Sequence, residues 1–426
     1  MDLRIPFSPR RLGRAVLAAT AMLAVHPSLP ASLDARLHAQ DAIGALPPRA
    51  AARLDSLVTR VIAPGVRHVR GVDVRGPWHI NVLTVDLSRA ALGIESARAG
   101  DALVGRESTS SIARRGGNRG TLDDAGVLAA VNADFFNVET GEQLAHQVVA
   151  GSVVKGLPAS DAVNHGQFLI DANGRPRIGT FDYAGSFAAP ARAASDQVRI
   201  GLDGVNALPT GRNGLTLFTS WVGARVPDDS LHRPRGSIGL QRAGTRADTI
   251  LWVRALRGPG AAVIPPDGAV LAGYGASRAR LAQLTRADTL RLLHRFAPVA
   301  GTVRTMVGGR PILIEAGRDL TTAPEYAATF ATAFSTTRHP RTAVGILPDG
   351  HTVLLVTVDG RQPSSAGMSL AELAVLLADL GARQALNLDG GGSTTMVVRD
   401  TIVNRPSDPG GERTVANVLL VVERDR

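Results

Sequence analysis

The chain has 426 residues, of which 44% are hydrophobic and none is cysteine. This composition is sufficient for a large buried core, and it excludes disulfides, thiol catalysis and thiolate metal ligands. The formal net charge is +10, but Lys155 is the only lysine and no basic run alternates with aromatic residues, so nucleic-acid binding is not predicted.

The N-terminus has the pattern of a signal peptide. Four arginines within the first 14 residues precede an apolar run at 15–25 that is too short to span a bilayer. We expect a leader at 1–39 with cleavage after Ala39, an exported periplasmic or extracellular protein, and no membrane span once the leader is removed. The polar residues 40–60 are expected to form a linker.

Most of the remaining chain alternates apolar and polar residues between turn signals, a pattern typical of strands. The predicted strands are 79–87, 126–136, 166–178, 215–222, 249–253, 352–358 and 384–388, and the predicted helices are 108–115, 277–284 and 369–380. The fold class is therefore predicted as α+β or mixed α/β, with strand-rich mixed sheets and a few covering helices.

The helix predicted at 369–380 is the best defined. Ser369 and Glu372 have the spacing of a capping box, one face is rich in leucine, and Gly381 follows as a stop signal.

This helix separates two predicted strands that each end in Asp-Gly. A strand, helix and strand of this length form a right-handed crossover between parallel strands. Asp359 and Asp389 would then lie at the same edge of one sheet, where α/β sheets bind ligands.

An earlier segment repeats this pattern, with residues 82–86 resembling 355–359 and 130–135 resembling 385–390. If the segment is a duplication, Asn132 and Asp134 correspond to Asn387 and Asp389. Chance similarity between two strand-rich segments is an equal alternative.

Three glycines, Gly390, Gly391 and Gly392, separate Asp389 from Ser393. The loop lacks the lysine of a P-loop and the spacing of a dinucleotide site. Glycine allows close approach to the backbone, so successive N–H groups and the Ser393 hydroxyl are expected to bind a phosphate or a sugar. A tight turn that requires glycine is the structural alternative.

Three segments, "RHPRTAVGILPDG", "VLLVTVDGRQPSSAGMSLAELAVLLADLGARQALNLDGGGSTTM" and "VNRPSDPGGERTVANVLLV", resemble the signature blocks of the phosphodiester glycosidase family, and "VNADFF" resembles an upstream block. The resemblance is densest over 338–422, and it predicts a catalytic domain over 61–426. It implies hydrolysis of a sugar-1-phosphodiester, with N-acetylglucosamine as the expected sugar, to free sugar and a phosphomonoester.

Such a reaction needs carboxylates near the anomeric carbon and cations near the phosphate. The candidate acids are Asp134, Asp359, Asp389 and Glu412, and the sequence does not distinguish nucleophile from base. The candidate phosphate ligands are Arg341, Arg405 and Arg413, with Arg341 favoured and Arg361 also within the blocks, and Asn132 is the candidate for a sugar hydroxyl.

No cofactor is required by this chemistry, although the acids leave a divalent cation open. Two rival functions remain: a non-catalytic envelope protein that binds polysaccharide, and a phosphodiesterase that releases sugar-1-phosphate. The small number of Trp and Tyr residues argues against the first, and the absence of metal-ligand spacing argues against the second.

Overall fold

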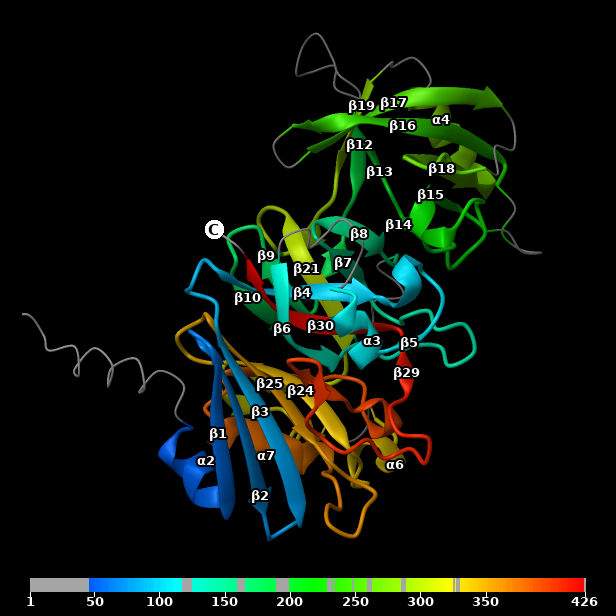
Figure 1. Ribbon diagram of the computed structural model, residues 1–426. Helices are drawn as coiled ribbons and strands as arrows, with labels where there is room; N and C mark the ends of the chain where they lie inside the picture. The colour runs from blue at the N-terminus through cyan, green and yellow to red at the C-terminus, as the bar shows by residue number, and fades with distance from the viewer. Residues whose placement is uncertain are drawn as a thin grey trace, which may run out of the picture. The chain divides into compact units, whose positions relative to one another are not determined.

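The computed structural model (Figure 1) describes residues 46–116, 125–158, 165–188, 199–227, 232, 234–246, 249–258, 263–284, 289–324, 326 and 330–424. The predicted signal peptide at 1–39 lies outside these residues. None of the helices in the described part of the chain has the length and apolar character that crossing a membrane requires.

An eight-stranded sheet carries the C-terminal signature segments. Its order is β1 (Ser56–Ala63), β2 (Val66–Asp73), β3 (Trp78–Asp86), β25 (Thr352–Val358), β24 (Arg341–Ile346), β26 (Gln384–Asn387), β22 (Ile312–Glu315) and β23 (Arg318–Asp319). Leucine and alanine side chains of helix α7 (Leu370–Asp379) cover one face of this sheet.

A five-stranded sheet packs against the other face, and the two sheets share one hydrophobic core. Its order is β28 (Thr401–Ile402), β27 (Met396–Val398), β6 (Ala125–Asn132), β30 (Asn417–Arg424) and β4 (Leu92–Arg98). Helix α3 (Thr109–Arg114) packs on the outer face of this second sheet.

Two further sheets share a second core. One is ordered β10 (Pro176–Gly179), β9 (Gly166–Asp171), β21 (Val303–Gly309), β7 (Gln147–Val149) and β8 (Ser152–Lys155). The other is ordered β13 (Arg199–Gly201), β12 (Ser186–Ala188), β19 (Thr289–Leu293), β17 (Thr249–Gly258), β16 (Gly236–Arg246), β18 (Gly268–Tyr274), β15 (Gly214–Thr219) and β14 (Gly204–Val205).

The remaining elements are short. They are the pairs β11 (Asp182–Tyr183) with β20 (Phe296–Ala297) and β29 (Thr414–Val415) with β5 (Glu107–Ser108), the helices α2 (Pro48–Arg53), α4 (Arg278–Leu284) and α6 (Thr332–Ser335), and the 3-10 turns η1 (Ala99–Asp101), η3 (Ser220–Val222), η4 (Gly275–Ser277) and η5 (Gly391–Ser393).

The predicted crossover is present. Strands β25 and β26 each pair antiparallel with β24, which lies between them, so β25 and β26 run parallel to one another and are joined by α7. Asp359 and Asp389 therefore do follow strands that end at the same edge. The expectation of mixed sheets needs correction, because among the described strands only β14 and β15 pair in parallel.

Two predicted boundaries were wrong. The expected strand at 166–178 is the hairpin of β9 and β10, because the chain reverses at Gly174, whose φ is +76°. The expected linker at 40–60 is not a linker from residue 48 onward, because α2 and the paired strand β1 occupy it. Residues 40–45 lie outside the described part.

The capping box at the start of α7 gives a test of local stability. Ser369 Oγ accepts the Glu372 amide and Glu372 accepts the Ser369 amide, as predicted. We expect Ser369→Ala to lower the free energy of unfolding by about 1 kcal/mol and Tm by roughly 2 °C. Ser369→Asp keeps a capping oxygen and should change Tm much less. Equal losses in both variants, measured by thermal denaturation, would contradict the capping role.

Candidate active site

Three strand ends bring two acids and one arginine together. Asp134 follows β6, Asp389 follows β26, and Arg310 follows β21. The Asp389 amide donates to the carbonyl of Ala133 at 2.8 Å, which joins the two acidic segments. The charge of Asp389 raises the pKa of Asp134, and the charge of Arg310 lowers the pKa of Asp389, so Asp389 lies within electrostatic range of both.

Asn132 holds this junction together. Its Nδ2 donates to the Asp389 carbonyl at 2.6 Å, and its Oδ1 accepts Thr342 Oγ1 at 2.7 Å and the Thr395 amide at 3.1 Å. The side chain is fully buried. The geometry therefore favours a positioning role for Asn132 and corrects the expectation that it binds a sugar hydroxyl.

Asp134 is the most deeply buried acid of the site. Its Oδ2 accepts the Ala145 amide at 3.1 Å, whereas Oδ1 has no hydrogen-bond partner among the described residues. The pKa of Asp134 is raised to about 7, chiefly by burial and also by the charge of Asp389, against the opposing effects of the Ala145 amide and Lys155.

Asp389 lies closer to solvent and to more donors. Burial raises its pKa to about 6, while the Ser393 hydroxyl, the Gly390 amide, Arg413 and Arg310 oppose the rise. Burial is deeper at Asp134, so a proton on Asp134 beside a negative charge on Asp389 is the arrangement that burial favours. Two acids with separated pKa values can act as a proton donor and as a charged carboxylate in one site.

Arg310 was missed in the sequence. It is partly buried, its guanidinium carbon lies 5.3 Å from the centre of the Phe135 ring, and its charge lowers the pKa of Asp389. The signal that was overlooked is the pair Gly308 and Gly309 directly before it, since adjacent glycines at a strand end indicate a close approach of another group.

Gly308 allows Asp134 to lie against β21. A Cβ atom there would lie 2.2 Å from Ala145 Cβ and 2.6 Å from a carboxylate oxygen of Asp134. We expect Gly308→Ala to displace this acid, to lower kcat at least about tenfold, and to destabilise the fold by about 1–3 kcal/mol.

The matched control is Gly126→Ala. Gly126 also lies in a strand, without a positive φ, and a Cβ atom there would meet nothing within 4 Å. Activity and Tm should be measured for both variants. Comparable activity in the two would contradict the close packing of Asp134 on β21.

The glycine loop forms the short 3-10 turn η5 rather than an open cradle. The amides of Gly391, Ser393 and Thr394 donate to carbonyls of Pro340, Gly390 and Gly391, and the Gly390 amide donates to Asp389 at 3.0 Å. The amides of Gly390, Gly391, Ser393 and Thr394 are thus engaged within the protein, which argues against the expected anion site of successive free N–H groups.

The glycines instead admit two arginines to the loop surface. A Cβ atom on Gly391 would lie 3.1 Å from a guanidinium nitrogen of Arg361, and one on Gly392 would lie 2.2 Å from Arg413. Arg413 is held by Asp408 through two hydrogen bonds of 2.8 and 3.0 Å. Arg413 thus remains a candidate phosphate ligand, and Arg361 joins it.

Arg341, the arginine that the sequence favoured as a phosphate ligand, bonds to backbone carbonyls instead. Its guanidinium is buried and donates to the carbonyls of Met368, Phe334 and Thr337 at 2.8 to 3.1 Å. These bonds fix the segment around α6, and burial lowers the pKa of Arg341 to about 10. The expectation that Arg341 clamps phosphate is therefore corrected.

Glu412 also has a structural partner. Its two oxygens accept the amide and hydroxyl of Ser110 at 2.8 and 2.6 Å, in the first turn of α3. A carboxylate at a helix N-terminus satisfies amides that lack a partner within the helix. This contact argues against a catalytic role for Glu412.

Asp359 bonds to the segment at residues 404 and 405. Its Oδ1 accepts Asn404 Nδ2 at 3.3 Å and the Arg405 amide at 3.0 Å, and Asn404 also donates to the Thr394 carbonyl at 3.0 Å. Burial raises the pKa of Asp359. Asp359 therefore supports the loop, and the Arg405 side chain is exposed.

Buried polar atoms without partners surround Lys155, whose charge reaches Asp134. Lys155 donates to the Gln143 carbonyl and pairs with Glu142 at 2.6 Å. Within the described residues, the buried amide groups of Gln143 and Gln147 have no hydrogen-bond partner. Such groups require water or a ligand, so this side of the site is suited to a polar molecule.

Residues 252–422, which contain Arg310, Asp389 and the glycine loop, match the model of one protein family. That family is the phosphodiester glycosidases. The resemblance predicted from the signature blocks is thereby confirmed for this part of the chain, whereas Asp134 lies upstream of the matched residues.

A curated phosphodiester glycosidase, the N-acetylglucosamine-1-phosphodiester alpha-N-acetylglucosaminidase of Bos taurus, is 47% identical over 68 residues. These residues are 16% of this chain and 12% of that enzyme. The chain thus matches about an eighth of the length of this curated relative.

Two solved structures are similar over most of the chain. A hypothetical protein from Synechocystis has a TM-score of 0.63 at 22% identity, covering 88% of this chain and 65% of that one, and shows a shared fold. A Burkholderia pseudomallei K96243 protein, named for its expected export, has a TM-score of 0.55 at 27% identity, covering 81% of this chain and 74% of that one.

Proposed function

We propose that the protein is an exported hydrolase that cleaves a glycosyl phosphodiester to free sugar and a phosphomonoester. The observation that carries this proposal is the pair Asp134 and Asp389, which follow strand ends joined by the hydrogen bond from the Asp389 amide to the Ala133 carbonyl, beside arginines suited to phosphate. N-acetylglucosamine is the sugar we expect, because the curated relative acts on an N-acetylglucosamine phosphodiester by its name.

The two acids have different roles in this reaction. Asp389, ionised above about pH 6, faces the positive charge that develops at the anomeric carbon, or activates the water that attacks it. Asp134, protonated below about pH 7, supplies a proton to the leaving phosphate oxygen. Arg310 and Arg413 stabilise the departing anion.

The test is product analysis by NMR with UDP-N-acetylglucosamine and an N-acetylglucosamine-1-phospho-mannoside. Free N-acetylglucosamine with UDP from the first substrate and mannose phosphate from the second supports the proposal, and the first anomer formed distinguishes retention from inversion. Sugar-1-phosphate would indicate a phosphodiesterase. Binding without turnover of any sugar phosphodiester would indicate a polysaccharide-binding protein.

A further inference from the structure

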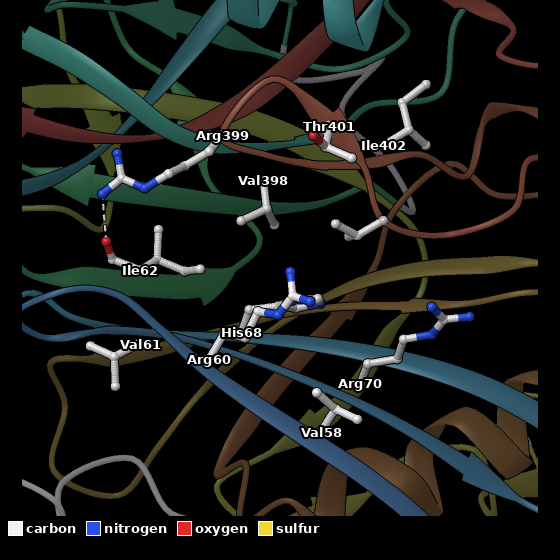
Figure 2. Close-up of a pocket in the computed structure, with 11 residues that line it drawn as sticks. Val58, Arg60, Val61, Ile62, His68, Arg70, Val398, Arg399, Thr401 and Ile402 are labelled. Carbon is white, nitrogen blue, oxygen red and sulfur yellow. Dashed lines mark hydrogen bonds between the residues drawn. The ribbon is translucent and has the colours of Figure 1, made fainter.

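A basic groove of about 810 Å³ opens between the β1–β2 hairpin and the β27–β28 hairpin. Figure 2 shows Arg60, His68 and Arg70 on one wall and Arg399 on the other. Arg399 is held in place by a hydrogen bond to the Ile62 carbonyl. The groove is distinct from the Asp134 and Asp389 pair.

The positive charge of this groove is not neutralised locally. No acidic side chain lines it, and among the described residues Arg60 and Arg70 form no ion pair. Both are exposed, and each arginine is always charged and suited to bidentate recognition of phosphate. Surface arginines usually have solvent or acids around them, so three that face one concave space indicate an anionic ligand.

One wall of the groove lies near Asp359, which supports the glycine loop. Arg70 pairs with Asn81, and Asn81 pairs with Thr357, on three adjacent strands. At about 4.8 Å per strand, Arg70 and Thr357 are roughly 10 Å apart, and Asp359 follows Thr357 by two residues. The charge of Arg70 accordingly acts on Asp359.

The wall that carries Arg399 is connected to the glycine loop through the chain. Strand β27 runs directly from the glycine loop to the tight turn at Arg399 and Asp400, both of which have a positive φ. A ligand against Arg399 would therefore lie one short strand away from the glycine loop.

We infer that this groove binds a polyanionic chain, and that the substrate is a glycan whose repeating units are joined by phosphodiesters. One unit would be cut at Asp389 while a neighbouring phosphate lies among Arg60, Arg70 and Arg399. This inference rests on the proposed function for the cleavage step, but the binding of a polyanion by the groove is independent of it.

The shape and surface favour a chain over the alternatives. A single phosphate would need only one of the arginines, whereas cations on both walls suit charges spaced along a polymer. The exposed side chains of Val58 and Val61, with Ile402, supply apolar surface for the faces of sugar rings. A membrane surface would require protruding rather than recessed cations.

The first experiment measures binding of inorganic polyphosphate to the full-length protein carrying Asp389→Asn, by calorimetry at low salt. Adding Arg60→Gln and Arg70→Gln should weaken binding at least tenfold and reduce its dependence on salt. Arg383→Gln removes an exposed arginine outside the groove and should change binding less than twofold. Equal effects of the groove and control variants overturn the inference.

The second experiment separates this inference from the proposed function. The Arg60→Gln/Arg70→Gln variant with Asp389 intact should raise KM at least tenfold for a phosphodiester-linked oligosaccharide, with kcat unchanged. KM for the methyl diester of N-acetylglucosamine-1-phosphate should not change. If the protein binds polyphosphate but hydrolyses neither substrate, the proposed cleavage is rejected and the binding of a polyanion by the groove is not.

Binding to vesicles of phosphatidylglycerol without binding to polyphosphate would overturn the glycan and indicate a membrane surface. Thermal denaturation of each variant should match that of the unmodified protein, since the replaced side chains are exposed. If the double variant fails to fold, Arg399→Gln gives the same comparison from the other wall, where weakened binding of polyphosphate is again expected.

Discussion

Replacing Asp389 with Asn is expected to lower kcat for a glycosyl phosphodiester at least about 1000-fold. Asn has the same shape and keeps an oxygen for the Gly390 amide, which lies 3.0 Å away, so the loop should fold as before. It cannot carry the negative charge that the transition state requires. The measurement is the steady-state rate on UDP-N-acetylglucosamine, with Tm as the check on folding.

The matched control is Asp359→Asn, because Asp359 follows strand β25, which runs parallel to β26. Asp359 Oδ1 accepts Asn404 and the Arg405 amide, which are the main effects that oppose the rise of its pKa, and the charges that act on it are those of His79 and Arg70. We expect less than about a tenfold loss in kcat for this variant. If Asp359→Asn were as damaging as Asp389→Asn, the assignment of the catalytic pair would have to include Asp359.

The position of Asp389 could be predicted because it depends on local and neighbouring elements. The capping box of α7, the two flanking strands and the Asp-Gly turns are all readable in one stretch of the chain, and the crossover rule then places both acids at one edge. The intervening strand β24 was not placed between them in advance, because strand order depends on contacts between distant segments.

The partners of individual side chains could not be predicted for the same reason. Arg341 and Arg413 lie in similar signature segments, but the first is buried under backbone carbonyls and the second faces the loop. Arg310 follows β21, which lies in a different sheet from β26, and no pattern near the glycine loop points to it. The close approach of Asp134 to β21 shows only in the tertiary packing around Gly308.

Asp134 is expected to support activity and to lower the stability of the fold at neutral pH. The pKa of Asp134 is about 7 in the folded protein and roughly 3.9 in an unfolded chain. The folded state therefore binds the proton more tightly, and stability falls as pH rises from about 4 to 7. Above this window ionised Asp134 costs up to about 4 kcal/mol.

Asp134→Asn should remove this cost, because Asn is neutral and its oxygen can accept the Ala145 amide. We expect the variant to have a higher Tm than the unmodified protein at pH 8, to differ little at pH 4, and to lose kcat at least about 100-fold at pH 6.5. Asp349→Asn is the contrasting control. Hydrogen bonds from Thr352 and His351 lower the pKa of Asp349, so its loss should destabilise the protein above pH 4.

A purely structural carboxylate would show the behaviour of Asp349, since ionisation that stabilises the fold is what a structural role requires. An acid kept in a site that opposes its charge lowers stability at neutral pH, and such a cost is characteristic of groups retained for function. An Asp134→Asn variant that is less stable at pH 8 and fully active would assign Asp134 to the core and leave Asp389 without its proton donor. A more stable and inactive variant would support the division of roles between the two acids.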